Sequence, residues 1–259
     1  RHRKRFNQRS LNEKQKGADE MKERIGAVIL AAGQGKRMHT AVAKQFLELN
    51  GRPLITYALS AFQESMAEDL VLVTGAEQLD YCRREIVEAF GFTKVKAVVA
   101  GGKERYHSVY EGLKALAQLG PMDYVLIHDG ARPMVNGEII QRSIEGARKY
   151  GACVAGMPVK DTIKLADAEG FGAGTPDRSR LWQIQTPQTF SFPLIFEAYS
   201  RILARPEGQE RITDDAMVLE AESDCRVKLI EGDYRNIKVT TPEDILIAEA
   251  LLKGEKGRK

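Results

Sequence analysis

Five short apolar runs rich in valine and isoleucine alternate with longer amphipathic segments, and this alternation constrains the fold of the 259-residue chain more than any other feature. The runs are expected to be buried strands, because parallel strands covered on both faces form continuous apolar stretches. They lie at residues 25–30, 70–73, 95–99, 124–127 and 152–157. The segments between them are expected to be helices, because their apolar residues recur every three or four positions. They lie at residues 53–63, 77–90, 106–118 and 137–150. The pattern predicts an α/β fold with a mostly parallel, doubly wound sheet.

Glycines follow three of the expected helices. Gly91, Gly120 and Gly151 each stand just after the last residue of the apolar pattern. A glycine in this position commonly ends a helix, because it adopts the left-handed backbone conformation without a steric penalty. We therefore expect these three glycines to be helix stops.

The region after Pro158 departs from the alternation. Residues 160–180 are rich in glycine and in mixed charge, with only short apolar pieces. We expect a hairpin arm, at about 158–181, that leaves the sheet and mediates dimerisation; a simple surface loop is the alternative. The chain then returns through residues 181–184, helices near 193–203 and 214–221, a strand at 226–230 and a final helix at 242–252.

The segment LAAGQGKRM follows the first strand and combines a glycine loop with cations. Gly33 and Gly35 let the backbone approach a phosphate closely, and Lys36, Arg37 and Lys44 can neutralise its charge. The segment is not a dinucleotide fingerprint, which needs a third glycine, and not a Walker A loop, which needs a Ser or Thr after the lysine. The loop suits a nucleoside triphosphate, whereas a turn with solvated charges is the alternative.

A second group of polar residues, HDGARP, follows the strand at 124–127. Asp129 stands at the end of this strand, where a carboxylate can hold Mg²⁺ against phosphate oxygens. Arg132 offers a planar fork for a phosphate or a carboxylate. An Asp before a Gly is also a common turn former, so Asp129 could instead cap a turn. Because ligands bind at the carboxyl ends of parallel strands, the glycine loop and Asp129 together favour a ligand site.

The net charge of +3 is concentrated in the terminal extension. Residues 1–20 contain seven Lys or Arg and three acids, so this segment carries +4 and the rest of the chain −1. We expect residues 1–20 to be a disordered basic extension, residues 21–253 a single domain, and residues 254–259 a disordered tail. The nearly neutral body argues against nucleic acid as a partner.

No apolar stretch approaches the roughly 20 residues of a membrane helix, and no secretory signal is recognisable at the N-terminus, so we expect no membrane partner and a cytoplasmic location. The three cysteines, Cys82, Cys153 and Cys225, are widely spaced and odd in number. They match no metal-binding spacing and no disulfide framework. Reduced thiols are therefore expected.

Five further motifs appear in order along the second half of the chain. They are VKDTIK from Val159, PDRSRLW from Pro176, QTPQ from Gln185, ITDDA from Ile212 and NIKVT from Asn236. Together with the glycine loop and HDGARP, they make the chain resemble the 2-C-methyl-D-erythritol 4-phosphate cytidylyltransferases of the non-mevalonate isoprenoid pathway. The resemblance runs from about residue 25 to residue 252.

The resemblance implies a Rossmann-like, nucleotidyltransferase-type fold and the transfer of CMP from CTP to a small sugar-alcohol phosphate. The acceptor phosphate would attack the α-phosphorus of CTP, with a divalent cation such as Mg²⁺ as cofactor and pyrophosphate as leaving group. A phosphate monoester is already ionised at neutral pH, so the reaction needs cations rather than a general base. This requirement agrees with the cationic loop.

The family's pattern also implies residue roles. The catalytic residues would be Arg37 and Lys44, which would stabilise the transition state, and Arg178 and Lys238, which would position the acceptor phosphate. Asp129 would hold the metal. The remaining sugar-phosphate contacts would come from Arg132, Thr162, Thr186 and Thr213. The nucleotide would contact Ala31, Ala32, Gly33, Gly35, Gly102, Ser108 and Asp129. In this family the arm crosses to a second subunit, so a homodimer with shared sites is implied.

Two departures and two alternatives accompany the resemblance. Lys103 stands where the family commonly has an acid, and Ala43 where many relatives have proline, so a side-chain role at the first position is in doubt. Ribitol 5-phosphate cytidylyltransferase shares the fold and is the alternative within the same class, although the arm motifs favour the methylerythritol enzyme. A non-catalytic nucleotide-binding protein is the alternative from a different class.

Overall fold

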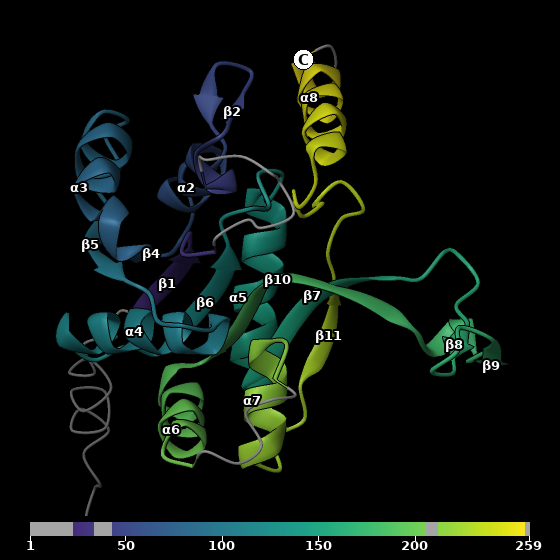
Figure 1. Ribbon diagram of the computed structural model, residues 1–259. Helices are drawn as coiled ribbons and strands as arrows, with labels where there is room; N and C mark the ends of the chain where they lie inside the picture. The colour runs from purple at the N-terminus through teal and green to yellow at the C-terminus, as the bar shows by residue number, and fades with distance from the viewer. Residues whose placement is uncertain (1–22, 34–42, 206–211, 257–259) are drawn as a thin grey trace, which may run out of the picture.

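A seven-stranded sheet forms the centre of the molecule (Figure 1). The computed structural model describes residues 23–33, 43–205 and 212–256. The strands follow the order β11-β7-β10-β6-β1-β4-β5 across the sheet. Their bounds are β1 (Ile25–Leu30), β4 (Asp69–Thr74), β5 (Val95–Ala100), β6 (Tyr124–Asp129), β7 (Ala152–Pro158), β10 (Trp182–Ser191) and β11 (Lys228–Glu231). All neighbours pair in parallel except β10, which is antiparallel to both β6 and β7. The expected α/β fold with a mostly parallel sheet is confirmed.

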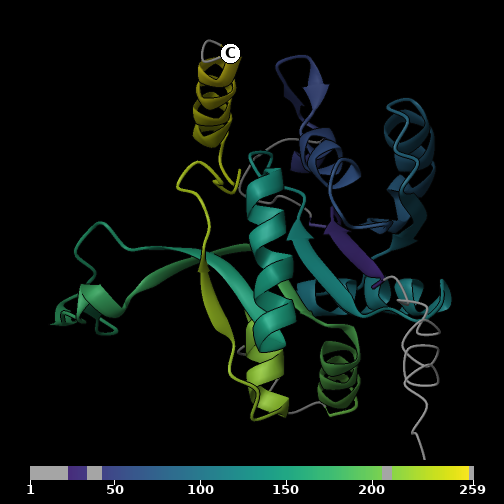
Figure 2. The ribbon, with the colours of Figure 1, turned by 180° about the vertical axis from the view of Figure 1, so that it is seen from behind.

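Helices cover both faces of this sheet (Figure 2). They are α2 (Ile55–Gln63), α3 (Leu79–Tyr81) with a π-helical continuation (Cys82–Glu88), α4 (Arg105–Gln118), α5 (Gly137–Tyr150), α6 (Phe192–Leu203) and α7 (Asp215–Glu222). The last helix, α8 (Pro242–Lys256), packs instead in a separate small core with Leu49 and Leu54. Alternate residues of β1 enter different cores: Val28 packs in the core with α4, α6 and α7, and Ile29 in the core with α2 and α5. Both faces of β1 are therefore buried, which explains its unbroken apolar sequence.

The expected helix stops are present. Gly91, Gly120 and Gly151 have φ values of 67°, 118° and 79°. Gly151 is the left-handed C-cap of α5, and the side chain of Asn136 caps the other end of that helix by accepting from the backbone N–H of Ile139. These local signals set the helix boundaries.

Strand β10 differs from the sequence-based expectation. We expected residues 181–184 to return the chain to the sheet, whereas the structure has a ten-residue strand through the middle of it. Proline is rare in a central strand, because it cannot donate to the ladder, and Pro187 therefore concealed this one. The pairing with β7 shifts register between Ile184 and Gln188, and this irregularity accommodates the proline.

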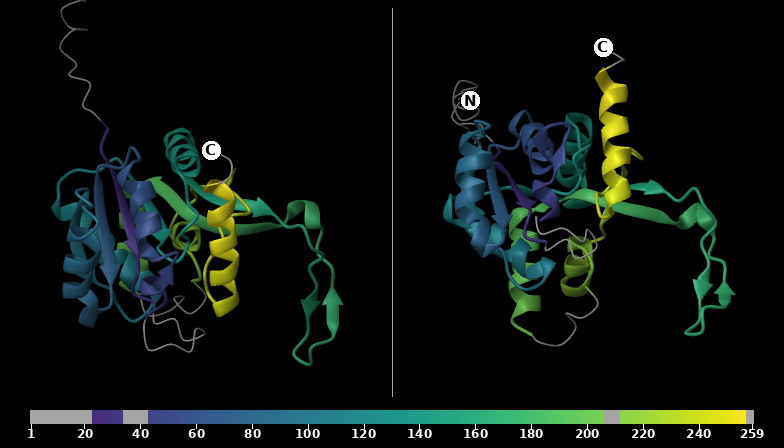
Figure 3. Two further views of the ribbon diagram at one scale, coloured as in Figure 1. Left: turned by 90° about the horizontal axis from the view of Figure 1, so that it is seen from above. Right: turned by 45° about the horizontal axis from the view of Figure 1, so that its top comes forward.

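The arm leaves the sheet between β7 and β10 and projects from the rest of the chain (Figure 3). Its outer part is a small hairpin of β8 (Leu165–Ala166) and β9 (Gly172–Gly174). Leu165 is 57% exposed and Phe171 68% exposed, although both are large apolar side chains. The predicted protruding hairpin is confirmed.

Helix α8 extends further than expected. It runs to Lys256, whereas we expected a helix end at Leu252 and a disordered tail from residue 254. Gly254 does not end the helix, and Lys253 in the last turn favours its continuation because a cation interacts well with the negative end of the helix dipole. The expected basic extension at 1–20 and residues 257–259 lie outside the described residues.

Across the described ranges, no helix is long and apolar enough to cross a membrane.

Candidate active site

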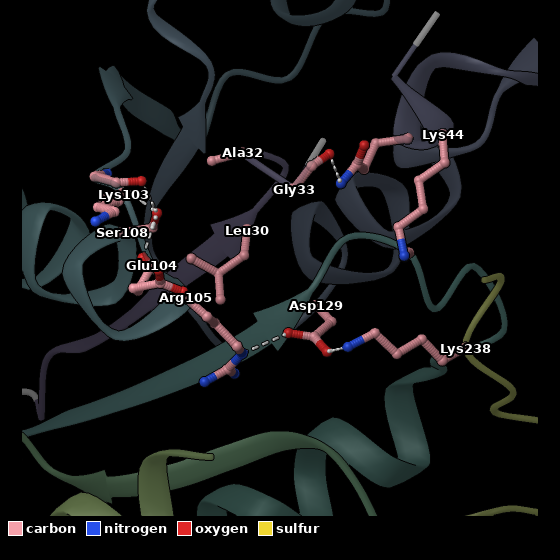
Figure 4. Close-up of a pocket in the computed structure, with 13 residues that line it drawn as sticks. Leu30, Ala32, Gly33, Lys44, Lys103, Glu104, Arg105, Ser108, Asp129 and Lys238 are labelled. Carbon is pink, nitrogen blue, oxygen red and sulfur yellow. Dashed lines mark hydrogen bonds and ion pairs between the residues drawn. The ribbon is translucent and has the colours of Figure 1, made fainter. Parts of the chain in front are cut away.

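Two cavities meet at the carboxyl end of β6, and they share one wall. The larger has a volume of about 630 Å³ (Figure 4). It is lined by Leu30, Ala32, Gly33, Lys44, Gln45, Gly102, Lys103, Glu104, Ser108 and Ala131. The smaller, of about 200 Å³, is lined by Arg132, Ile184, Gln185, Thr186, Gln188, Thr213 and Asp214. Arg105, Asp129 and Lys238 line both cavities. The shared wall is therefore made of two cations and one carboxylate.

The register of the sheet brings the two sequence-predicted centres together. Strands β1 and β6 are parallel neighbours, and Leu30 at the end of β1 pairs with Asp129 at the end of β6. The backbone N–H of Gly130 donates to the carbonyl of Leu30 at 2.8 Å. The segment that begins the glycine loop and the HDGARP segment thus leave the sheet side by side, as parallel neighbours must.

Asp129 is paired with a cation at each of its two oxygens. Its Oδ1 accepts from Arg105 Nε at 3.1 Å, and its Oδ2 accepts from Lys238 Nζ at 2.6 Å. Burial alone would raise the pKa of Asp129, but the charges of Arg105, Lys238 and Arg132 lower it well below its ordinary value. The carboxylate is therefore ionised across the physiological pH range.

A buried chain of hydrogen bonds fixes the backbone beneath Asp129. The backbone N–H of Asp129 donates to Thr186 Oγ1 at 3.0 Å, and the same hydroxyl contacts His128 Nδ1 at 3.0 Å. Nε2 of His128 lies 3.3 Å from the carbonyl of Arg132. Because a carbonyl only accepts, Nε2 carries the proton, Nδ1 accepts from Thr186, and every partner is satisfied.

Burial also decides the charge of His128. The ring is fully buried, and this burial lowers its pKa to about 4. His128 is therefore neutral at physiological pH, which the hydrogen bond accepted by Nδ1 requires. The geometry gives it a structural place under the shared wall rather than a position in either cavity.

Lys238 is placed by a loop that is fastened to β10. Asn236 is fully buried, and its Nδ2 donates to the carbonyl of Thr186 at 2.9 Å. On the other side of Lys238, the backbone N–H of Val239 donates to the carbonyl of Ala131 at 2.8 Å. The asparagine of the NIKVT motif thus anchors the loop, and the lysine two residues later reaches Asp129.

The turn before α4 forms one wall of the larger cavity through close backbone approach. A Cβ on Gly101 would lie 2.6 Å from Ser108 Oγ and 2.7 Å from the Cβ of Ala32, so only glycine fits. The backbone N–H of Gly102 donates to Ser108 Oγ at 3.2 Å. The backbone of this turn therefore packs directly against the end of β1.

Arg132 lies in the smaller cavity with its fork directed at the protein. Its Nη1 donates to the carbonyl of Asn236 at 2.8 Å and its Nη2 to that of Ile184 at 3.4 Å. Burial lowers its pKa, which Asp129 opposes and the charge of Arg105 reinforces. Within the described part of the chain, its buried Nε has no hydrogen-bond partner. Both Nη groups therefore bind carbonyls of the protein, and the buried Nε does not reach the cavity surface.

The predicted site residues fall into four groups. Residues in the walls of the two cavities are Ala32, Gly33, Lys44, Gly102, Ser108, Asp129, Arg132, Thr186, Thr213 and Lys238. Ala31 is fully buried, and its backbone N–H donates to the carbonyl of Val73, so it lines neither cavity. Arg37 and Gly35 lie outside the described residues.

The arm residues form the fourth group. Thr162 and Arg178 are both exposed and line neither cavity. Nη1 of Arg178 donates to the carbonyl of Lys160, at the base of the same arm, at 2.8 Å. Their own chain therefore does not bring these two side chains to the cavities.

Arg105 and Asp215 were not predicted from the sequence as site residues. Asp214 and Asp215 both stand at the start of the helix expected near 214–221, where carboxylates are favoured, and the side chain of Asp214 does cap α7. Asp215 is instead fully buried and binds Arg105 with both oxygens, at 2.8 Å each. Arg105 lies in the first turn of α4, where a cation opposes the helix dipole. This unfavourable position was the available signal that Arg105 has another role.

A metal ion would find one oxygen ligand in the shared wall. Among the residues that the structure describes, no group of three or more His, Cys, Asp or Glu could hold a metal. A single carboxylate fits Mg²⁺ that keeps waters and binds substrate phosphates, because this ion rarely uses an all-protein cage. Asp129 therefore fits such an ion when phosphates supply further oxygens.

Comparison with known proteins identifies the family. The sequence model described as 2-C-methyl-D-erythritol 4-phosphate cytidylyltransferase matches residues 25–254. A protein of that name from Lachnospira eligens is 49% identical over 229 residues, which cover 88% of this chain and 99% of the relative. One from Alkaliphilus oremlandii is 46% identical over 231 residues, which cover 89% and 95%.

A solved structure has the same fold. The 4-diphosphocytidyl-2C-methyl-D-erythritol synthase of Anaerococcus prevotii superposes with a TM-score of 0.76 at 34% identity, over 89% of this chain and 96% of that one. The match includes the mainly parallel sheet and therefore confirms the nucleotidyltransferase-type fold. With the family model and the relatives, it shows that the chain belongs to the 2-C-methyl-D-erythritol 4-phosphate cytidylyltransferase family.

Proposed function

We propose that the chain transfers CMP from CTP to 2-C-methyl-D-erythritol 4-phosphate, giving 4-diphosphocytidyl-2-C-methyl-D-erythritol and pyrophosphate. A phosphate oxygen of the acceptor attacks the α-phosphorus of CTP in line and forms a new P–O bond. The bond between the α-phosphorus and the oxygen that bridges it to the β-phosphorus breaks, and pyrophosphate leaves. The observation that carries the proposal is the pair of cavities with a shared wall of Arg105, Asp129 and Lys238. Two polyanionic substrates could meet there, in a chain of this family.

The larger cavity would take CTP. Its main-chain wall at Gly33 and Gly102 can recognise a base, and Lys44 can bind a phosphate. By the family's pattern, Gly35 would also contact the nucleotide and Arg37 would stabilise the transition state. The cations would stabilise the charge that develops on the crowded phosphorus, which is the main task in phosphoryl transfer.

The smaller cavity would take the acceptor. Arg132 adds a positive charge there, Thr213 adds a hydroxyl, and Lys238 can bind the phosphate at the shared wall. Thr186 lines this cavity too, but its hydroxyl already serves Asp129 and His128. We therefore propose that Thr186 supports the site through the backbone of Asp129.

Asp129 would hold the divalent cation. When bound, Mg²⁺ neutralises phosphate charge and polarises the P–O bonds of the nucleotide. The role of the protein is to keep the carboxylate ionised and directed at both cavities, which Arg105 and Lys238 achieve in the structure.

The arm would complete the site of a second chain. Thr162 and Arg178 lie outside the cavities of their own chain, and the arm exposes Leu165 and Phe171. Exposed apolar side chains on a projecting hairpin are typical of an interface between subunits. Sedimentation should give a dimer for the full chain and a monomer after replacement of residues 161–177 by a short glycine linker.

A cytoplasmic location is supported by the cysteines. Cys82, Cys153 and Cys225 are all free, and the first two are buried. Burial raises the pKa of Cys153 to about 12, so this thiol is inert. Free thiols are typical of a reducing compartment.

Pyrophosphate release tests the proposed reaction. The chain should release pyrophosphate from CTP and Mg²⁺ with 2-C-methyl-D-erythritol 4-phosphate, and not with ATP, GTP or UTP. Ribitol 5-phosphate is the control acceptor, because release with this acceptor alone would favour the alternative activity, that of a ribitol 5-phosphate cytidylyltransferase. Nucleotide binding without release from either acceptor would favour a non-catalytic protein.

A further inference from the structure

Arg105 is the only arginine of the described residues that lines both cavities. It comes from the first turn of α4 and extends to the carboxylate of Asp129 (Figure 4). Its side chain is 28% exposed, which is the part that faces the cavities. A guanidinium in this position lies where the phosphates of two substrates would meet.

Asp215 holds the other edge of the guanidinium. Asp215 Oδ1 and Oδ2 accept from Arg105 Nη1 and Nη2, each at 2.8 Å, in a bidentate pair. Oδ1 of Asp215 also accepts from the hydroxyl of Tyr199 at 2.6 Å. Asp215 and Tyr199 are both fully buried, so this carboxylate is within reach of Arg105 but not of a ligand. The bidentate pair fixes the plane of the guanidinium.

Two further contacts fix Asp215 itself. Gln188 Oε1 accepts from the backbone N–H groups of Asp215 and Ala216, at 3.0 Å each. Its Nε2 donates to Asp214, the residue that caps α7, at 3.1 Å. The first turn of α7 is therefore fastened to β10. The first turn of α7 and strand β10 thus determine the direction of Arg105.

We propose that Arg105 is a further catalytic residue and that Asp215 is its positioning residue. The proposal rests on the proposed function. In the transfer step, the guanidinium of Arg105 would stabilise charge on the phosphoryl oxygens between the incoming phosphate and the leaving pyrophosphate. Arginine suits this task because it stays charged and because each Nη carries a second N–H beside the one that Asp215 accepts. Asp215 never touches a substrate and acts by aiming Arg105.

A purely structural ion pair would look different. Asp215 is neutralised by the two Nη atoms alone, so the pair would not need Nε to reach Asp129. A structural arginine would also not need to be exposed to both cavities. Burial alone would lower the pKa of Arg105, but Asp215 and Asp129 raise it well above its ordinary value. The guanidinium therefore stays charged between its two carboxylate partners and still lines both cavities.

The first test compares Arg105→Lys and Arg105→Gln in the full-length protein. Arg105→Gln should lower kcat for pyrophosphate release by about 10²- to 10³-fold, because a preorganised donor is lost, and Arg105→Lys should lose less. The Kd of CTP with Mg²⁺, measured by calorimetry, should change less than about threefold, because the contact is made mainly in the transition state. The matched control is Arg148→Gln. Arg148 also pairs with a carboxylate, Glu23, but lines neither cavity. The kcat of the Arg148→Gln protein should therefore equal that of the wild type.

The second test asks whether Asp215 acts through Arg105. Asp215→Asn keeps an oxygen for Tyr199 and should lower kcat about tenfold, with little change in the KM for CTP. In the Arg105→Lys background the same substitution should add almost nothing, because there is no fork left to aim. If Asp215→Asn does not fold, Tyr199→Phe makes the same test with a smaller effect, of about threefold.

The outcomes separate the two proposals. Wild-type kcat in Arg105→Gln, or an undiminished Asp215→Asn effect in the Arg105→Lys background, would overturn the inference and leave the proposed function intact. A wild-type protein that releases no pyrophosphate would overturn the proposed function and the inference with it.

Discussion

The charged side chains of the shared wall and of the arm differ in burial and in how they are paired. In the wall, Asp129 is paired at both oxygens with Arg105 and Lys238, and the three groups come from β6, α4 and the loop before α8. On the arm, Arg178 contacts only the base of its own hairpin among the residues described, and its surroundings are exposed. The residues of one chain therefore build the wall, whereas Thr162 and Arg178 on the arm line neither of its two cavities.

This difference teaches where a site can be preorganised. Buried charges need partners at fixed distances, so the wall is assembled as the domain folds. Exposed charges on a long hairpin gain little free energy from pairing in water, so they stay able to bind a group outside their own chain. The wall should therefore fail when one residue changes, and the arm should fail in a way that a second chain can repair.

The largest effect is expected from the carboxylate of the wall. Asp129→Asn should lower kcat about 10³-fold, because it removes the proposed metal ligand and the counter-charge of Lys238 and Arg105 together. Steady-state pyrophosphate release measures this effect, with Asp80→Asn as control, since Asp80 pairs with Arg83 on the surface. A loss smaller than tenfold in a folded Asp129→Asn protein would contradict the central place of the wall.

A substitution on the arm should cause a smaller loss of activity, and a second chain with an intact arm should restore it. Arg178→Ala should lower kcat/KM for the acceptor about hundredfold, because Arg178 is proposed to position the acceptor phosphate. Mixing and re-equilibrating equal amounts of Arg178→Ala and Asp129→Asn chains should restore about a quarter of the wild-type sites, since half of the dimers are mixed and each has one intact site. No recovery of activity in verified mixed dimers would show that each arm serves its own chain.

A third difference concerns hydroxyl groups and stability. Thr186→Val should lower the free energy of unfolding by about 1–3 kcal/mol, because it leaves the buried N–H of Asp129 and Nδ1 of His128 without their partner. Thr162→Val, on the exposed arm, should change it by less than about 0.5 kcal/mol. Urea denaturation of both variants measures the contrast. Equal destabilisation by the two substitutions would be evidence against it.

The smallest expected effect on folding is at the tip of the arm. Phe171→Ser should change the free energy of unfolding by less than about 0.5 kcal/mol, since the ring is 68% exposed. The same substitution should weaken self-association, if the arm forms the interface. Sedimentation over a range of concentrations measures the dimer affinity, and an unchanged affinity would place the interface elsewhere.

Much of the fold could be predicted, because its signals are local. The apolar runs, the helix periodicity and the stops at Gly91 and Gly151 each depend on a few neighbouring residues. Strand β10 could not be predicted over its full length. Its proline and polar residues argue against a central strand, and only the irregular pairing between Ile184 and Gln188 makes room for them.

The candidate site divides in the same way. Asp129 and Gly33 could be predicted to line a site, because polar residues and glycines that follow a strand are recognisable once the strand is recognised. The pairing of Arg105 with Asp215 spans 110 residues, and nothing in either local sequence indicates it. Asp215 looks like its neighbour Asp214 until the structure shows that one caps a helix and the other is buried on an arginine.

The sequence by itself determined the alternation of strands and helices, the edge of the sheet at which charges gather, and the family, because each of these follows from periodicity, turn chemistry or ordered motifs. The tertiary structure alone decided the insertion of β10, the shared wall between two cavities and the separation of the arm residues from both. The physical reason is that the direction and charge pairing of a buried side chain depend on helices and strands far away in the chain, which pack against it only after folding.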